Sequence, residues 1–251
     1  DDAYTPHDEG GKRPDRAVTV YTQKCREAYS HVPVVVGGIE ASLRRLAHYD
    51  YWSESVKRSV LIDSTADMLL YGNSERALVD LTHRLANGES IKQITDLRGT
   101  AFLHKKIPQG WREIDSTSVD QVGATKKAKN PYDAPHPSNC DDAKKIRTEA
   151  EAPKIDQQET QIVSLVPDTQ AIKTDPSSTY IRMPSFEQVE NDPVLYAHSD
   201  RIFHRETNPG NARPLVQSQG RNDICVNPPP IPLETEELDW VFEQPYKRVP
   251  H

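Results

Sequence analysis

Apolar residues are concentrated in the first 115 positions of this chain, in short runs that alternate with helical spacing. Residues 32–36 form a β-branched run that ends at Gly37 and Gly38, as in a strand buried on both faces of a parallel sheet. A helical pattern or a further apolar run follows over 40–47, 60–62 and 68–71. Strand, glycine turn, helix and strand in this order predict a doubly wound α/β sheet.

Capping residues mark the helices expected further along the chain. Asn73 or Ser74 can cap a helix that Gly88 is placed to end. The apolar face of this helix holds Ala77, Leu78, Leu81 and Leu85. Ser185 begins a capping box, and Asp192-Pro193 opens a second helical pattern. Periodicity leaves residues 17–21 open between a strand and the start of a helix.

Composition divides the chain into three parts. Hydrophobic residues make up 35% of the 251 positions and there are 20 prolines, so a uniform globule is not expected. Residues 1–115 should form an α/β domain, and the charged, apolar-poor segment 116–178 should be a mobile insertion or linker, with one hairpin at 161–166. Order should resume in 179–251, with a strand at 223–227 and a last helix over 236–242, capped by Thr235.

The net charge, the lack of a long apolar run and the residues at the two ends of the sequence argue against several classes of protein. The formal net charge of −7 argues against broad binding to nucleic-acid backbones, which needs a basic face. No apolar run approaches the roughly 20 residues that span a bilayer, and the first residues lack the features of a signal peptide. We therefore expect a soluble, cytoplasmic protein. The absence of an initial Met and the abrupt end at His251 favour a piece of a longer protein.

Recognised catalytic and metal motifs are missing from the sequence. Cys25, Cys140 and Cys225 lie more than 80 positions apart, so closely spaced thiols cannot form a metal site. The histidines show no His-Glu-x-x-His spacing, and neither Gly-x-Ser-x-Gly nor a P-loop occurs. His7 resembles part of a cobalamin-ligating loop, but Thr5 stands where that loop has Asp, so we expect no cobalamin.

Two stretches are candidates for binding. Backbone amides at Gly37 and Gly38, beside Glu40, could approach an anion or a cofactor, although a tight turn without a ligand also fits. The second stretch combines cations with polar aromatic residues that could stack on a ligand: Arg44, Arg45, His48, Tyr49, Tyr51, Trp52, Lys57 and Arg58. Solvated helix faces and aromatic packing are the alternative interpretation.

Long and uncommon strings make the chain resemble the YgiQ family of bacterial radical SAM proteins. They are DDAYTP (1–6), GGKRPDRA (10–17), GGIEASLRR (37–45), HYDYW (48–52), YGNSERA (71–77), ETNPGNAR (206–213), NPPPIPL (227–233) and PYKRVPH (245–251). The resemblance implies a flavodoxin-like domain, similar to cobalamin-binding domains and truncated at its N-terminus. A segment leading to a partial TIM barrel would follow it. It also implies a CxxxCxxC loop beyond His251 that holds a [4Fe-4S] cluster and S-adenosylmethionine.

The chain departs from that pattern because none of its cysteines has a partner nearby in sequence. We therefore expect the parent protein to be a radical SAM enzyme of unknown substrate. We expect this part alone to lack catalysis and to have its own C-terminal radical SAM domain as partner. A bare hydrophobic surface near residues 223–251 would favour this interpretation. The alternative is a stand-alone binding module for an anion, a nucleotide or an RNA element.

Overall fold

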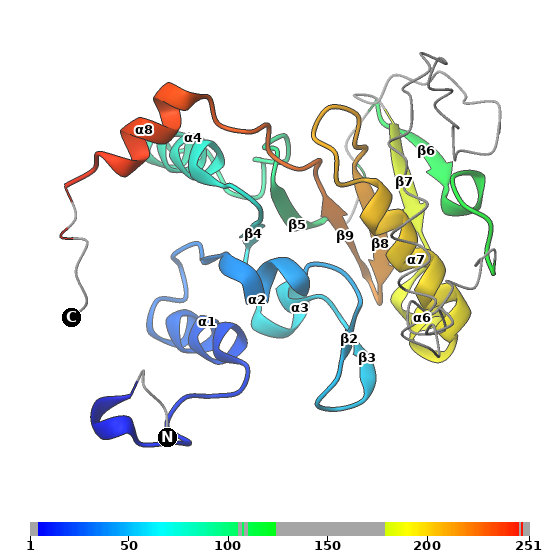
Figure 1. Cartoon of the computed structure of the whole chain (residues 1–251), viewed down its shortest axis with the longest axis horizontal. Coiled ribbons are helices and arrows are strands. Elements are labelled where there is room, and N and C mark those ends of the chain that lie inside the picture. Colours follow the sequence, from blue (N-terminus) through cyan, green and yellow to red (C-terminus); the bar gives the residue numbers. More distant parts are fainter. Residues whose placement is uncertain (1–4, 105–106, 108–109, 124–178, 246, 248–251) are drawn as a thin grey trace, which may run out of the picture. The chain divides into compact units, whose positions relative to one another are not determined.

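The structure is a computed structural model that describes residues 5–104, 107, 110–123, 179–245 and 247. Seven strands form one mixed sheet in the order β1-β4-β5-β9-β8-β7-β6 (Figure 1). Their bounds are Val35–Val36 (β1), Met68–Leu70 (β4), Thr100–His104 (β5), Arg112–Asp115 (β6), Thr179–Met183 (β7), Leu215–Gln219 (β8) and Asn222–Val226 (β9). The predicted hairpin at 161–166 lies outside the described residues.

Strand directions distinguish this sheet from the parallel one expected from the sequence. β1 and β4 are parallel, and so are β6, β7 and β8, but β5 and β9 run antiparallel to their neighbours. The α/β class is confirmed, and the seven-stranded sheet is mixed rather than wholly parallel. Short apolar runs predict buried strands but carry no information on neighbour direction. The β5–β9 ladder joins strands of 1–115 and 179–251 in one sheet.

Helices flank the sheet and largely follow the predicted patterns. Their bounds are Ala17–Ala28 (α1), Gly38–Leu43 (α2), Val60–Ser64 (α3), Glu75–Ala86 (α4), Phe186–Asn191 (α6), Pro193–Arg205 (α7) and Thr235–Phe242 (α8). Residues 17–21 are thus helical, and the apolar run 60–62 lies in a helix. The capping box at Ser185 is confirmed. The predicted cap at Thr235 is wrong, because Glu234 makes the reciprocal capping bonds one residue earlier.

The two faces of the sheet carry separate parts of the core. One face packs against α2, α3 and α7 through residues such as Ala41, Leu61 and Ile202. On the other face, Met68 and Leu70 pack against Ala77 and Leu81 of α4. Leu78, expected on the same apolar face of α4, is instead 49% exposed. Among the described residues, no helix has the length and apolar character to cross a membrane.

Candidate anion-binding pocket

A short hairpin forms the base of the candidate site. Strand β2 (His48–Asp50) pairs antiparallel with β3 (Ser55–Lys57), and His48 lies directly opposite Lys57. Because alternate residues of a strand share a face, His48 and Asp50 point to the same side as their partners Ser55 and Lys57. The hairpin therefore presents an imidazole, a carboxylate, a hydroxyl and an ammonium group on one surface.

Two buried glutamines of β8 hold this hairpin on the main sheet. Gln217 Oε1 accepts a hydrogen bond from the Ala47 N–H at 2.8 Å, directly before β2. Gln219 Oε1 accepts one from the Ser59 N–H at 2.8 Å, just after β3. The two amide side chains also bond to each other at 2.9 Å. Both ends of the hairpin are thus fixed to a strand at the centre of the fold.

A basic pocket of about 320 Å³ lies beside the hairpin. Its lining includes cations from three separate elements: Arg16 at the start of α1, Arg44 at the end of α2, and Lys57 in β3. His48, Ser53 and Thr19 add groups that can donate hydrogen bonds. Three cationic side chains that line one concave surface favour the binding of an anion.

Ion pairs neutralise the arginines of this region but not the lysine. Arg16 pairs with the buried Asp50, and Arg44 Nη1 lies 3.0 Å from Glu40 Oε1. Among the described residues, Lys57 has no ion-pair partner. Each arginine uses only part of its five N–H donors in these pairs. Asp63 also lines the pocket but pairs with Arg58, so among the described residues the pocket keeps one cation without an ion-pair partner and several donors for a ligand.

Two titratable groups beside the pocket have pKa values that their surroundings shift. The hydrogen bond from Ser53 and the ion pair with Arg16 lower the pKa of Asp50, so this carboxylate stays charged. Burial lowers the pKa of His48, and the nearby Arg44 charge adds to the decrease. A neutral His48 can donate from one ring nitrogen and accept at the other. Its Nδ1 lies 3.2 Å from the Leu46 carbonyl oxygen.

Two aromatic side chains project from the turn of the hairpin. Tyr51 and Trp52 are 69% and 53% exposed, and their ring centroids lie 5.4 Å apart in an edge-to-face arrangement. Large rings that stay in water can stack on planar ligand groups. Of the predicted patch, His48 and Arg44 line the pocket, whereas Tyr51 and Trp52 are outside its lining and directly precede Ser53, which lines it.

Arg45, which was predicted for the same patch, faces the interior instead. Its guanidinium carbon lies 4.2 Å from the ring centroid of Tyr71 and 4.0 Å from that of Phe203. Burial lowers its pKa, and its Nε is buried without a hydrogen-bond partner among the described residues. This cation–π sandwich joins α2 to β4 and α7 and makes Arg45 a packing residue in this structure.

The glycine turn before α2 lies outside the basic pocket's lining. Gly38 has φ +82°, a conformation that favours glycine, and a Cβ on Gly37 would lie 3.4 Å from the Leu70 carbonyl oxygen. Glu40 accepts a hydrogen bond from the Val18 N–H at 3.4 Å besides its ion pair with Arg44. These contacts explain the turn by local packing, and α2 is only six residues long.

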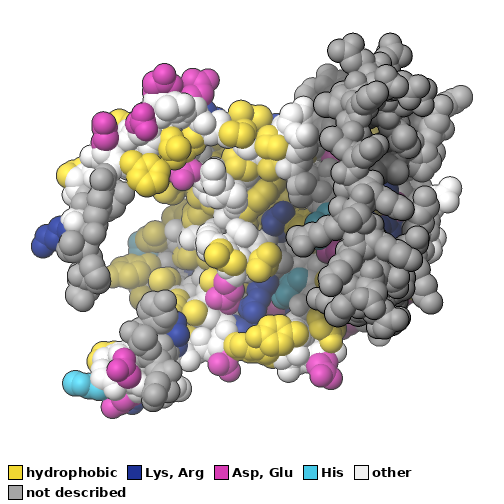
Figure 2. All heavy atoms as spheres, in the orientation of Figure 1, with side chains coloured by type: hydrophobic (Ala, Val, Ile, Leu, Met, Phe, Trp, Pro, Cys, Tyr) yellow, Lys and Arg dark blue, Asp and Glu magenta, His cyan; other side chains and the backbone are white. Residues whose placement is uncertain are grey.

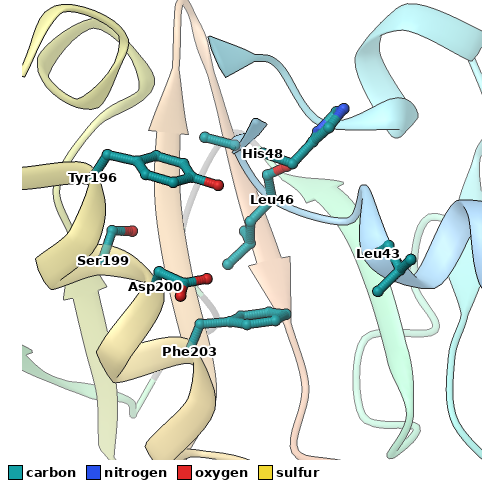
Figure 3. Close-up of a pocket in the computed structure, with 8 residues that line it drawn as sticks. Leu43, Leu46, His48, Tyr196, Ser199, Asp200 and Phe203 are labelled. Atoms are coloured by element: carbon teal, nitrogen blue, oxygen red, sulfur yellow. The ribbon is translucent and has the colours of Figure 1, made fainter. Parts of the chain in front are cut away.

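A smaller cavity of about 60 Å³ adjoins the pocket through His48, which lines both. Figure 3 shows Tyr196, Asp200 and Phe203 of α7 pointing toward Leu46, whereas the His48 ring turns away from α7. The Tyr196 hydroxyl accepts a hydrogen bond from the Tyr49 N–H at 2.9 Å. Helix α7 therefore braces the hairpin from the side opposite the basic pocket.

A buried polar cluster around Asp120 was missed at the sequence level. His198 is fully buried, with Nδ1 3.2 Å from Asp120 Oδ2 and Nε2 3.1 Å from Ser116 Oγ. Arg201 and Arg205 also contact the Asp120 carboxylate, at 2.7 and 2.9 Å. Residues 116–123, which were predicted to begin the linker, include a short 3-10 helix (Ser116–Ser118) and the Asp120 contacts. Among the described residues, the partners of the Asp120 carboxylate come from the distant helix α7, so no local pattern signals this cluster.

The described residues do not fit an iron–sulfur cluster. Cys25 is exposed on α1, and Cys225 is buried in β9, where burial raises the pKa of its thiol to about 12. A cluster ligand must be a thiolate, which this environment opposes. Among the residues described, no group of three or more His, Cys, Asp or Glu side chains could hold a metal ion.

Comparison with known proteins assigns the family. The family described as Radical SAM N-terminal matches residues 1–251. The chain is 56% identical to a UPF0313 protein of Pseudomonas aeruginosa over its whole length and 33% of that protein. It is 54% identical to the UPF0313 protein YgiQ of Escherichia coli K12, again over the whole chain and 32% of that protein.

The chain therefore spans about a third of the length of these curated relatives. No solved structure matches it. The long strings that suggested the YgiQ family are thus confirmed as evidence of kinship, and the chain belongs to the Radical SAM N-terminal family, as a region similar to part of the UPF0313 proteins.

Proposed function

We propose that this chain is the N-terminal part of a [4Fe-4S]-dependent radical SAM enzyme and that it binds an anionic ligand for that enzyme. The ligand would be a phosphate-bearing molecule held in the basic pocket. The observation that carries this proposal is the convergence of Arg16, Arg44 and Lys57 on one pocket, where Lys57 has no ion-pair partner among the described residues. The substrate of the whole enzyme stays undefined.

The cysteines available as cluster ligands indicate which part of the protein holds the iron–sulfur cluster. The family supports radical chemistry in the longer protein, while the described cysteines do not fit its cluster. We therefore assign the cluster and S-adenosylmethionine to the protein's remaining part, in a partial TIM barrel. The parallel β1–β4 pair, connected through α2 and α3, supports kinship with flavodoxin-like domains, although β5 and β9 depart from that topology.

The exposed ring pair favours a nucleotide over inorganic phosphate as ligand. Tyr51 and Trp52 follow Asp50, whose side chain is tied to Arg16 at the pocket. Stacking of one base on an aromatic side chain contributes about 1–3 kcal/mol. A free phosphate would use the cations alone, whereas a nucleotide would use the cations and the rings. This difference allows the two ligand classes to be separated by experiment.

The test uses the full-length protein and calorimetric titration with two probes, pyrophosphate and ATP. Lys57→Gln should weaken both by about tenfold, because one charge-assisted hydrogen bond contributes roughly 1.5 kcal/mol. Trp52→Ala should weaken ATP alone. Lys92→Gln is the matched control, since Lys92 is exposed and lies outside the pocket lining. Equal losses for Lys57→Gln and Lys92→Gln, or no binding of either probe, would refute the proposal.

A further inference from the structure

A second concave surface lies between α4 and α8, away from the basic pocket's lining. The two helices lie side by side in Figure 1, and Arg76 of α4 joins them. Its Nε donates to Glu237 Oε1 at 2.6 Å, and its Nη1 donates to the Ile231 carbonyl oxygen at 3.0 Å. The groove between the helices has a volume of about 580 Å³. Its floor includes Val79, Leu233 and Trp240.

Helix α8 leaves its large apolar side chains uncovered. Among its eight residues none is buried, and Trp240 and Phe242 are 59% and 57% exposed. Leu238 and Val79 are also exposed. Figure 2 shows hydrophobic and acidic side chains next to each other over these two helices. Contiguous apolar surface with a polar rim is typical of a docking site, and exposed tryptophan is a common anchor of such interfaces.

The lining of the groove is predominantly acidic, although Arg76 and His83 also line it. Glu75, Asp80 and Glu236 line it, whereas Arg76 is already paired with Glu237. Glu75 Oε2 is buried and has no hydrogen-bond partner among the described residues. The carboxylates that line the groove together favour a partner segment that carries lysine or arginine. The groove therefore calls for a segment that combines apolar side chains with positive charge.

A second copy of the chain is a poor occupant. In a two-fold symmetric dimer each groove would face its copy, so the acidic rims would repel each other. Another part of the same polypeptide fits better, because the curated relatives are about three times as long as this chain. A tethered segment also needs little contact area, since its effective concentration reaches the millimolar range for short linkers.

We propose that the α4–α8 groove binds a basic, apolar segment from the part of the same protein outside residues 1–251. Trp240 is the anchor, and Glu75 receives a lysine or arginine of that segment. This inference rests on the proposal that the chain belongs to a longer enzyme. It is independent of anion binding at the basic pocket.

Photo-crosslinking in the full-length protein tests the docking. p-Benzoylphenylalanine replaces Trp240 in one variant and Tyr29 in a control, since Tyr29 is 62% exposed at the end of α1. Crosslinked peptides are then identified by mass spectrometry. We expect the variant at 240 to crosslink within one polypeptide, to a peptide outside residues 1–251. Adding Glu236→Lys should lower that yield about fivefold through repulsion of the basic segment.

Other outcomes would overturn the inference. Crosslinks between two copies, to a different protein, or only within residues 1–251 exclude the proposed occupant, and so does an equal yield at position 29. Iron content of the same preparation separates this result from the proposed function. Absence of iron from the preparation would contradict the radical SAM role. This result does not depend on whether crosslinking shows a segment of the same polypeptide in the groove.

Discussion

The polar cluster around Asp120 and the basic pocket both gather charged side chains from distant elements, but they differ in how far those charges are satisfied. Asp120 is buried and contacts His198, Arg201 and Arg205. Burial raises its pKa, yet the hydrogen bonds from Arg201 and His198 outweigh burial, and the net shift is downward. In the basic pocket, Lys57 has no ion-pair partner among the described residues.

This difference separates a structural network from a binding site. A buried cluster whose donors and acceptors match can anchor a helix but offers nothing to a ligand. The Ser116–His198–Asp120 geometry resembles a catalytic triad, yet His198 is fully closed off from solvent and two arginines neutralise the carboxylate. An open pocket with surplus charge has the opposite properties. We therefore expect the substitutions that lower stability and the substitutions that weaken ligand binding to lie at different residues.

The largest expected effect on stability follows from removing the centre of the buried cluster. Asp120→Ala leaves His198, Arg201 and Arg205 without their shared acceptor. Breaking a buried ion pair on one side typically costs 3–5 kcal/mol, and partial exposure of the two arginines reduces this to about 3 kcal/mol. Urea unfolding of the full-length protein measures the change.

The control for this prediction is Asp200→Ala on α7, the helix that carries the partners of Asp120. Its side chain is 52% exposed and contacts only the exposed His204 among the ion pairs of α7. We expect its free energy of unfolding to stay within about 0.5 kcal/mol of the wild type. Equal destabilisation by the two variants would contradict the structural role of the Asp120 cluster.

A smaller effect that links the two regions is expected for Gln217→Ala. The change removes the acceptor for the Ala47 N–H and the donor to the Pro184 carbonyl oxygen. Unsatisfied buried groups cost about 1–3 kcal/mol each, so we expect a loss of roughly 2 kcal/mol. Hydrogen exchange of residues 48–57 should accelerate, because one end of the hairpin is released. Gln93→Ala, at an exposed position, should change neither quantity.

The smallest effect concerns the pH dependence of the α8 contact. The hydrogen bond from Arg76 lowers the pKa of Glu237 to about 2, from its ordinary value of 4.5. A carboxyl whose folded pKa is depressed stabilises the fold above its unfolded pKa and loses that contribution as pH falls. Exchange of the α8 amides, corrected for intrinsic rates, should therefore rise between about pH 4.5 and 2. Glu237→Gln should remove this transition, and a persistent transition would contradict the assignment.

Local chemistry explains which elements could be predicted. Helices α4 and α7 begin directly after the predicted positions Ser74 and Asp192, although only the Asp192 side chain makes cap hydrogen bonds, and β9 ends before the triple proline at 228–230. Strand β8 was not predicted, because only its first two residues are apolar and the polar Gln217, Ser218 and Gln219 that follow look exposed in the sequence. The burial of the two glutamines depends on partners about 160 positions away, such as Ser59.

The candidate site was predicted by composition rather than by geometry. The clustering of cations and aromatic residues indicated Arg44, His48 and Trp52, but it did not separate Arg45, which turns inward. Arg16 lies far from this stretch in sequence and reaches the pocket only through its pairing with Asp50. Three-dimensional contacts between distant residues, which no local pattern contains, decide both cases.

The central claim is that this chain supplies ligand recognition while another part of the protein holds the cluster. The most direct test measures iron content and ATP affinity on one preparation of full-length Arg44→Gln/Lys57→Gln protein. We predict iron content equal to that of the wild type and ATP binding weakened by about a hundredfold, from two lost charge-assisted contacts. Unchanged ATP affinity together with loss of iron would contradict the claim.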